Sequence, residues 1–96
     1  MSKIQLELEL IERHVLILKE VMENEPIGIL RLADKLKIPT HKVRYSLRML
    51  EQEGLIKPTQ NGAKITEKMK SYMPTVKSQL KGMSDRLAKI VSNLPP

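Results

Sequence analysis

Basic and aromatic side chains gather between positions 40 and 48, at a spacing suited to contact with a nucleic acid. Helical periodicity turns Val43, Leu47 and Leu50 toward one side. The opposite side then carries Thr40, His41, Lys42, Arg44, Tyr45 and Arg48. Arg44 and Arg48 are four residues apart, so they share a face. Since arginine can donate two hydrogen bonds to a guanine edge, the pattern predicts a helix that enters the major groove of duplex DNA. The alternative is a solvated helix face.

These residues have different expected roles. Arg44 or Arg48 reads base edges, and Lys42 and Thr40 contact phosphate. Tyr45 stacks on a sugar or contacts a thymine methyl group. A second set, which follows along a short hairpin, is expected along a phosphate backbone or the minor groove. It consists of Lys57, Gln60, Asn61 and Lys64. The alternative for this set is a hairpin whose polar tip meets only water.

The remaining polar residues do not form a catalytic or metal-binding pattern. The two histidines, His14 and His41, are far apart, and the chain has no cysteine. Asp34 and Asp85 are isolated acids, and the chain has no Ser/His/Asp set or glycine-rich phosphate loop. We therefore expect no enzyme activity, no metal site and no cofactor.

Composition limits the class of protein. The chain has 96 residues, 41% of them hydrophobic, with two tyrosines and neither Phe nor Trp, so we expect one small domain with an aliphatic, Met-rich core. The net charge of +6 suits a polyanionic partner. No apolar run approaches the ~18 residues that a membrane span needs. The N-terminus does not resemble a signal peptide, and we expect a cytoplasmic protein without a membrane partner.

Two amphipathic helices joined by a tight turn are expected over residues 29–53. Ile29, Leu32, Ala33 and Leu36 form the first apolar stripe. Pro39 ends the first helix because it disfavours helical geometry at the preceding residue. Thr40 is expected to cap the second helix, and Gly54 to end it in a left-handed conformation.

The hairpin is expected over residues 55–66, with Asn61-Gly62 as its turn because both residues tolerate positive φ. Pro58 marks an edge strand or the tip, and Ile27-Gly28 a very short strand. Thr66 is expected to cap the last helix.

A long first helix is expected over residues 4–24, although the LELEL alternation also fits a strand. Ile4, Leu8, Ile11, Val15, Leu18 and Met22 form a heptad stripe, and a second stripe, of Leu6, Leu10, Ile17 and Val21, lies on another side. One stripe can pack on the core, and the other needs a further partner.

The last helix carries a heptad seam of Met69, Met73, Val76, Leu80, Met83, Leu87, Ile90 and Leu94. Pro74 either kinks this helix or begins a second one. Residues 1–25 are net acidic and residues 67–96 net basic. We infer that the first and last helices pack on each other, at least partly across a homodimer. The expected dimer residues are Ile4, Leu8, Ile11, Val15, Met73, Val76, Leu80, Met83, Leu87 and Ile90. Packing in this seam is favoured for the methionines over an effector pocket, which nothing else in the sequence supports.

Three segments carry a family resemblance: LADKL, PTHKVRYSLRMLEQEGLI and ITEK. Together they resemble a winged helix-turn-helix of the MarR/ArsR-like kind found in bacterial and archaeal regulators. The resemblance implies a mainly α fold with a small β-hairpin wing, and dimeric binding of double-stranded DNA. The metal ligands of the ArsR-like proteins are not present here, so metal sensing is not carried over.

The resulting hypothesis is a winged helix-turn-helix domain over residues 1–66 and a helical dimerisation segment over residues 67–96. Its expected function is sequence-specific regulation of transcription, with the helix at residues 40–52 in the major groove. One alternative is a weakly specific architectural DNA-binding protein. Another is a protein-interaction module that does not bind DNA, with the second stripe of helix one as its docking face.

Overall fold

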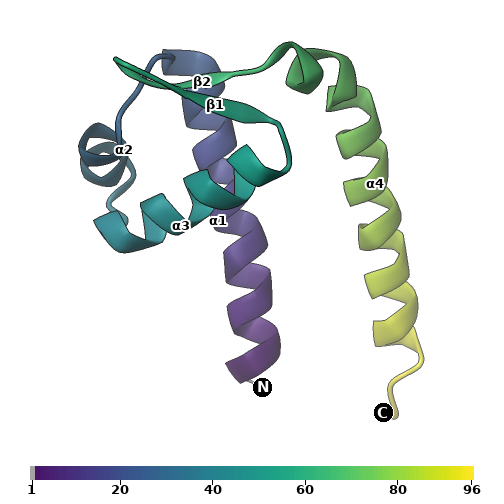
Figure 1. Ribbon diagram of the computed structural model, residues 1–96. Coiled ribbons are helices and arrows are strands. Elements are labelled where there is room, and N and C mark those ends of the chain that lie inside the picture. Colours follow the sequence, from purple (N-terminus) through teal and green to yellow (C-terminus); the bar gives the residue numbers. More distant parts are fainter. Residues whose placement is uncertain (1) are drawn as a thin grey trace.

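The computed structural model describes residues 2–96, which form four helices and one hairpin (Figure 1). In chain order the elements are α1 (Ser2–Asn24), α2 (Ile29–Leu36), α3 (Thr40–Gln52), β1 (Ile56–Thr59), β2 (Gly62–Ile65) and α4 (Glu67–Ser92). The hairpin lies against one end of α1, and α3 crosses α1 below it. This arrangement confirms a mainly helical winged helix-turn-helix with extended first and last helices.

Helix α1 is continuous through the LELEL segment that also fitted a strand. Leu and Glu are good helix formers, and the apolar positions further along the chain keep the helical period. Ile17 and Val21 are fully buried, so this half of the second stripe packs on the core, whereas Leu6 is 63% exposed and Leu10 is partly buried. Most of the heptad stripe stays exposed, at Ile4, Leu8, Ile11, Val15 and Met22.

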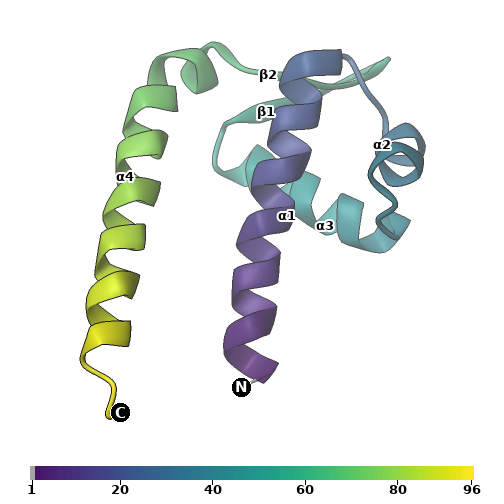
Figure 2. The ribbon, with the colours of Figure 1, turned by 180° about the vertical axis from the view of Figure 1, so that it is seen from behind.

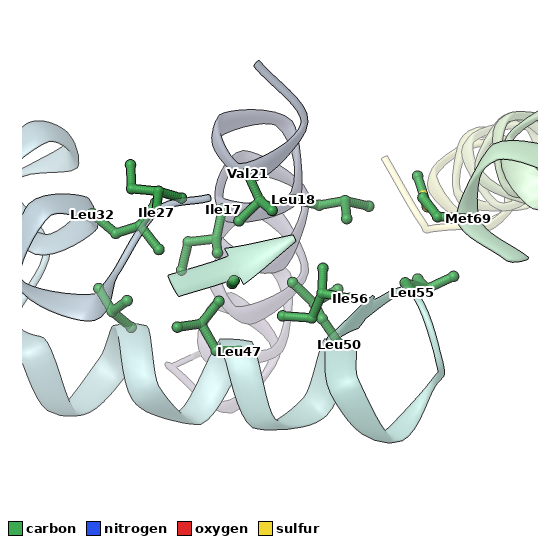
Figure 3. Close-up of a cluster of buried hydrophobic side chains, with 12 residues drawn as sticks. Ile17, Leu18, Val21, Ile27, Leu32, Leu47, Leu50, Leu55, Ile56 and Met69 are labelled. Atoms are coloured by element: carbon green, nitrogen blue, oxygen red, sulfur yellow. The ribbon is translucent and has the colours of Figure 1, made fainter. Parts of the chain in front are cut away.

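An aliphatic core joins α1, α3 and the hairpin (Figure 3). The close-up shows side chains from α1, among them Ile17, pointing toward Leu47 and Leu50 of α3 and Ile56 of β1. Met69, in the first turn of α4, is also fully buried. Among the described residues the buried core is therefore aliphatic, as the composition predicted, but it holds one methionine rather than several, and the half-buried Tyr72 packs against it.

The turn between α2 and α3 differs in one detail from the prediction. Lys37 adopts a left-handed conformation with φ of 56°, and the Ile38 N–H donates to the Ala33 carbonyl over 3.1 Å. Pro39, not Thr40, occupies the N-cap of α3, and no side chain caps that helix. The prediction for Thr40 was wrong because the extended residue is the proline, whose carbonyl begins the helical hydrogen bonds.

Helix α3 ends as predicted. Gly54 has φ of 76°, and its N–H donates to the Glu51 carbonyl, while the Leu55 N–H reaches back to the Leu50 carbonyl. These two bonds form a Schellman motif, in which a left-handed glycine satisfies the last carbonyls of a helix. The motif turns the chain directly into β1.

The wing is an antiparallel hairpin whose register pairs Thr59 with Gly62. The two loop residues are Gln60 and Asn61, so the predicted Asn61-Gly62 turn was placed one residue too late. Only Gly62 has positive φ, at 127°. A Cβ there would lie 2.5 Å from the Ile27 carbonyl carbon, so glycine is needed for the close approach of two backbones.

Residue Ile27 forms the predicted short strand as a single bridge to β2. It exchanges two backbone hydrogen bonds with Ala63, of 3.1 and 2.8 Å. The N–H and carbonyl of Ala63 therefore point away from Pro58, the residue that pairs with Ala63 in β1. Because Ala63 makes no backbone hydrogen bond to Pro58, the missing N–H of proline breaks no bond of the hairpin. Proline therefore fits this edge strand.

Helix α4 begins at the predicted cap. The Thr66 side chain accepts a hydrogen bond from the Met69 N–H. The helix is continuous through Pro74, which settles the choice between one helix and two, and Figure 1 shows it changing direction near its start. Every side chain from residue 77 to residue 92 is exposed, and in Figures 1 and 2 α4 stands apart from α1. Within one chain, the two helices therefore leave most of their heptad stripes uncovered.

Among the described residues, no helix combines the length and the apolar character that a membrane crossing requires.

Candidate nucleic-acid interface

Helix α3 divides into a buried and an exposed side, as its sequence predicted. Val43, Leu47 and Leu50 are buried, together with Ser46. All six of the predicted DNA contacts on this helix are exposed: Thr40, His41, Lys42, Arg44, Tyr45 and Arg48. The helix thus presents three cations and a tyrosine to solvent.

A groove of about 860 Å³ runs between α3 and the wing. Arg44 and Arg48 line its helical side, and Gln60 and Asn61 line it from the hairpin loop. Apolar side chains, including Leu47 and other core residues, lie between the two sides. The fold therefore brings together two sets of predicted contacts that are separated by a dozen residues in the sequence.

Lysine side chains of the wing lie elsewhere. Lys57 pairs with Lys64 across the two strands, so both lie on one face of the hairpin. Neighbouring positions alternate between faces, and Ala63 is buried on the core side. Lys57 and Lys64 therefore point away from the groove. Two like charges directly opposite each other destabilise a hairpin, and a phosphate close to both would relieve that repulsion.

Lys42 also lies outside the groove. It lines a second hollow, of about 350 Å³, with Glu9 and Glu12 of α1 and residues of the α2–α3 turn. At 3.6 residues per turn, a residue two positions from Arg44 lies roughly on the other side of the exposed face. Lys42 and Arg44 therefore face different directions from α3.

Glu51 is a groove residue that sequence reasoning missed. It is exposed and lines the same groove as Arg48, three residues earlier on the helix. A carboxylate beside two arginines repels phosphate and can accept a hydrogen bond from a cytosine amino group. The signal in the sequence was the helical spacing of Glu51 from Arg44 and Arg48, which puts all three on the same side of α3.

Ser46 connects α3 to α1 through side-chain hydrogen bonds. Its side chain is fully buried, and Arg13 Nε donates to its hydroxyl oxygen over 3.0 Å. His14 Nδ1 lies 2.8 Å from the same oxygen. With the imidazole proton on Nε2, the Ser46 hydroxyl donates to Nδ1 while it accepts from Arg13. Burial, and then the positive charge of Arg13, lower the pKa of His14.

The same cluster positions Tyr45. Its ring centroid lies 6.1 Å from that of His14, and the two planes are tilted by 36°. Tyr45 remains 42% exposed, so much of its surface stays accessible to solvent beside His14. Among the described residues, no group of three or more His, Cys, Asp or Glu side chains lies together in a way that would hold a metal ion.

Comparison with known proteins identifies a family whose sequence model matches the chain. Residues 10–83 match the model of a family described as the CggR N-terminal DNA binding domain. The matched segment contains all of α2, α3 and the wing, with most of α1 and more than half of α4. No individual curated protein shows significant similarity to the chain. The match supports a DNA-binding regulator domain and does not single out the MarR/ArsR-like kind.

Proposed function

The chain belongs to this family of CggR N-terminal DNA binding domains, and from that premise we propose that it regulates transcription by binding specific DNA sequences as a homodimer. Helix α3 enters the major groove, and the wing follows the adjacent phosphate backbone. The observation that carries this proposal is the groove shared by Arg44 and Arg48 with the wing loop.

Base reading falls to the arginines. Arg44 and Arg48 are exposed on one face of α3, and neither forms a salt bridge among the described residues. Their guanidinium groups are therefore available for guanine edges, where a bidentate pair discriminates against a wrong base by about 1–3 kcal/mol. Glu51 beside them favours cytosine on the same principle.

The residues proposed to contact phosphate lie on either side of Arg44 and Arg48. Thr40, His41 and Lys42 lie in the first turn of α3, which also offers backbone N–H groups that no side chain caps. On the other side, Gln60 and Asn61 form the tip of the wing. Lys57 and Lys64 supply positive charge on its outer face. Such contacts fix the position of the protein on the duplex without reading its sequence.

A homodimer would place two copies of α3 on one face of the duplex. Half-sites about one helical turn apart, ~34 Å, would then form a palindrome. The exposed apolar stripes of α1 and α4 are the surfaces that support self-association. Removing them from water would favour a dimer.

The test is a binding titration of the full chain against genomic fragments enriched for binding and against random duplex, at two salt concentrations. We expect a few fragments to bind well above random duplex, and we expect Arg44→Ala and Arg48→Ala each to cost about 1–3 kcal/mol on those fragments. Base specificity should relax at the position that each arginine contacts.

The matched control is Lys81→Ala/Lys89→Ala, which removes two cations from the outer side of α4. It should leave specific binding within about twofold. Uniform binding of all duplexes, with a steep loss at higher salt, would instead establish the architectural alternative. Absence of binding at both salt concentrations would refute DNA binding and favour a protein-interaction module.

A further inference from the structure

The exposed half of α4 lacks the packing that normally stabilises a helix. Residues 77–92 are all exposed, and the helix contains Pro74 and Gly82. Isolated helices of ~12–15 residues are marginal in water, and glycine weakens them further. Its apolar positions nevertheless keep heptad spacing, with exposures that rise from 36% at Leu80 to 57% at Ile90. This half of α4 therefore needs a surface outside the fold of its own chain.

Helix α1 offers a stripe of matching length and spacing. Ile4, Leu8, Ile11 and Val15 are each 45–59% exposed. From Val15 back to Ile4 the stripe steps by four, three and four residues. From Val76 forward to Leu87, α4 steps by the same numbers. The two stripes therefore match layer by layer when the helices run antiparallel. The layers are Val15 with Val76, Ile11 with Leu80, Leu8 with Met83 and Ile4 with Leu87.

Charges beside the stripes support this antiparallel register. Glu7 immediately precedes Leu8, and Arg86 immediately precedes Leu87, so the two flank the same side of the seam. On the other side, Glu12 follows Ile11 and Lys77 follows Val76. Both pairs are of opposite sign in the antiparallel register. In a parallel register the same acids face Ser84 and Gln79, and no opposite-charge pair forms.

Pairing of like helices is disfavoured by the same residues. Two copies of α4 packed on each other have no acid beside the seam, so Lys77 and Arg86 find no opposite charge. A parallel pair of α1 copies would bring Glu7 of one copy against Glu12 of the other. Like-charge contacts at an interface disfavour association. The partner that fits each stripe is thus the other helix.

The start of α4 is fixed on its own domain. Met69 is fully buried, and Thr66 both caps the helix and donates to the Gly54 carbonyl over 2.6 Å. From this anchor α4 runs beside α1 in the opposite direction but apart from it in both views (Figures 1 and 2). A helix from a second copy can lie on α1 without moving that anchor.

We propose that α4 of one copy packs antiparallel on α1 of a second copy, and that the reverse contact forms at the same time. The exchange is self-complementary, so it closes with twofold symmetry. It places four helices in one bundle with Glu7–Arg86 and Glu12–Lys77 pairs at its borders. This inference rests on the proposed homodimer and specifies which helices form it.

The test uses two charge-reversed chains. One carries Glu7→Lys/Glu12→Lys, and the other carries Lys77→Glu/Arg86→Glu. Each alone should have a dimer dissociation constant at least ~10-fold above that of the wild type, since like charges then border both helix pairs. A 1:1 mixture should recover a heterodimer, because each altered helix then meets an altered partner. Native mass spectrometry and analytical ultracentrifugation measure both outcomes.

Alternative pairings give different results. If α4 packs on α1 of its own chain, mixing restores nothing, since each chain keeps its own repulsion. If like helices pair, each single variant stays as dimeric as the wild type, because no opposite-charge pair is lost. Either result overturns the exchange.

The matched controls reverse charges at outer positions. Glu9→Lys/Glu23→Lys and Lys81→Glu/Lys89→Glu change the net charge equally and should leave the wild-type dissociation constant within about threefold. Helical circular dichroism should show that all variants fold. A wild-type chain that is monomeric at every concentration would refute both the exchange and the homodimer. Binding to a single half-site, lost on Arg44→Ala/Arg48→Ala, would still test the DNA-binding part of the proposal separately.

Discussion

Ser46 shows how one small residue connects the two faces of this domain. It lies on the buried side of α3, yet its hydroxyl contacts Arg13 and His14 of α1. These two residues are interleaved with Ile11 and Val15 of the exposed stripe. The orientation of α3 is therefore tied to the helix segment for which we propose a partner.

At this same residue scale, stability should depend on the protonation of His14. Its pKa is lowered by burial and by Arg13, so the unfolded chain binds more protons than the folded one around and below the ordinary value of 6.5. The stability that the fold has with neutral His14 is present in full above that value. It is lost as the pH falls through the lowered pKa of the folded state. We expect the free energy of unfolding in urea to decrease between pH 7.5 and pH 5.5.

Comparison with His14→Gln isolates this residue, because every other side chain is the same in both proteins. The stability advantage of the wild type should shrink as the pH falls. An advantage that stays constant over this interval would contradict the lowered pKa.

Two threonines show what a single residue type can and cannot reveal. Both Thr40 and Thr66 precede a helical pattern and were predicted to cap it. Thr66 does so with extended backbone angles, φ of −98° and ψ of 165°. Thr40 lies one residue inside α3, because Pro39 already supplies the extended cap conformation. Sequence signals identified the helix starts, but the cap position depended on which neighbour had the extended backbone.

At the scale of elements, glycines in the wing and in α4 should respond oppositely to alanine. Gly62→Ala places a Cβ against the Ile27 backbone at positive φ, so we expect a loss of at least ~1–3 kcal/mol. Gly82 lies within a helix, and a Cβ there meets open space. Gly82→Ala should therefore stabilise by about 0.5–1 kcal/mol.

Urea unfolding at one fixed protein concentration measures both changes. The single-alanine pair is matched in chemistry and differs only in backbone conformation and contacts. Equal effects of the two substitutions would show that the wing does not depend on its close approach to Ile27.

Elements with strong periodicity were predictable, whereas their packing partners were not. The seam of α4 and the two stripes of α1 follow directly from apolar spacing. The sequence did not show that the chain itself buries only Met69 and the start of the seam. The hairpin register shifted by one residue from its prediction because the contact of Gly62 with Ile27 lies outside the local turn sequence.

For the whole molecule, the candidate site was partly predictable for the same reason. Helical spacing placed Arg44 and Arg48 together, but only the fold could show Gln60 and Asn61 opposite them. Lys42 and the wing lysines turned out to face other directions. Charge and residue type predicted the class of partner, and three-dimensional packing determined which residues share a surface.

At the scale of the whole molecule, we expect the part that folds and the part that forms the dimer to separate where α4 leaves the core. Every core residue lies between Ile17 and Met69, so a chain ending at Val76 is expected to keep the winged fold. It loses most of the exposed seam and should be monomeric. Its thermal midpoint should then be independent of protein concentration, whereas that of a full-length dimer rises with concentration.

The same truncation should also weaken DNA binding. A dimer that holds both half-sites binds a palindrome more tightly because its second α3 binds at a high effective concentration. Truncation after Val76 should lower affinity for a palindromic site by ~10²–10⁴-fold while leaving affinity for a single half-site within about threefold. Gly82→Pro provides a full-length counterpart, because proline inside a helix costs ~3 kcal/mol or more and should disrupt the same seam. If both variants bound the palindrome as tightly as the wild type, residues 77–92 would not be part of the dimer interface. The two copies of α3 would then have to be held together by another surface of the domain.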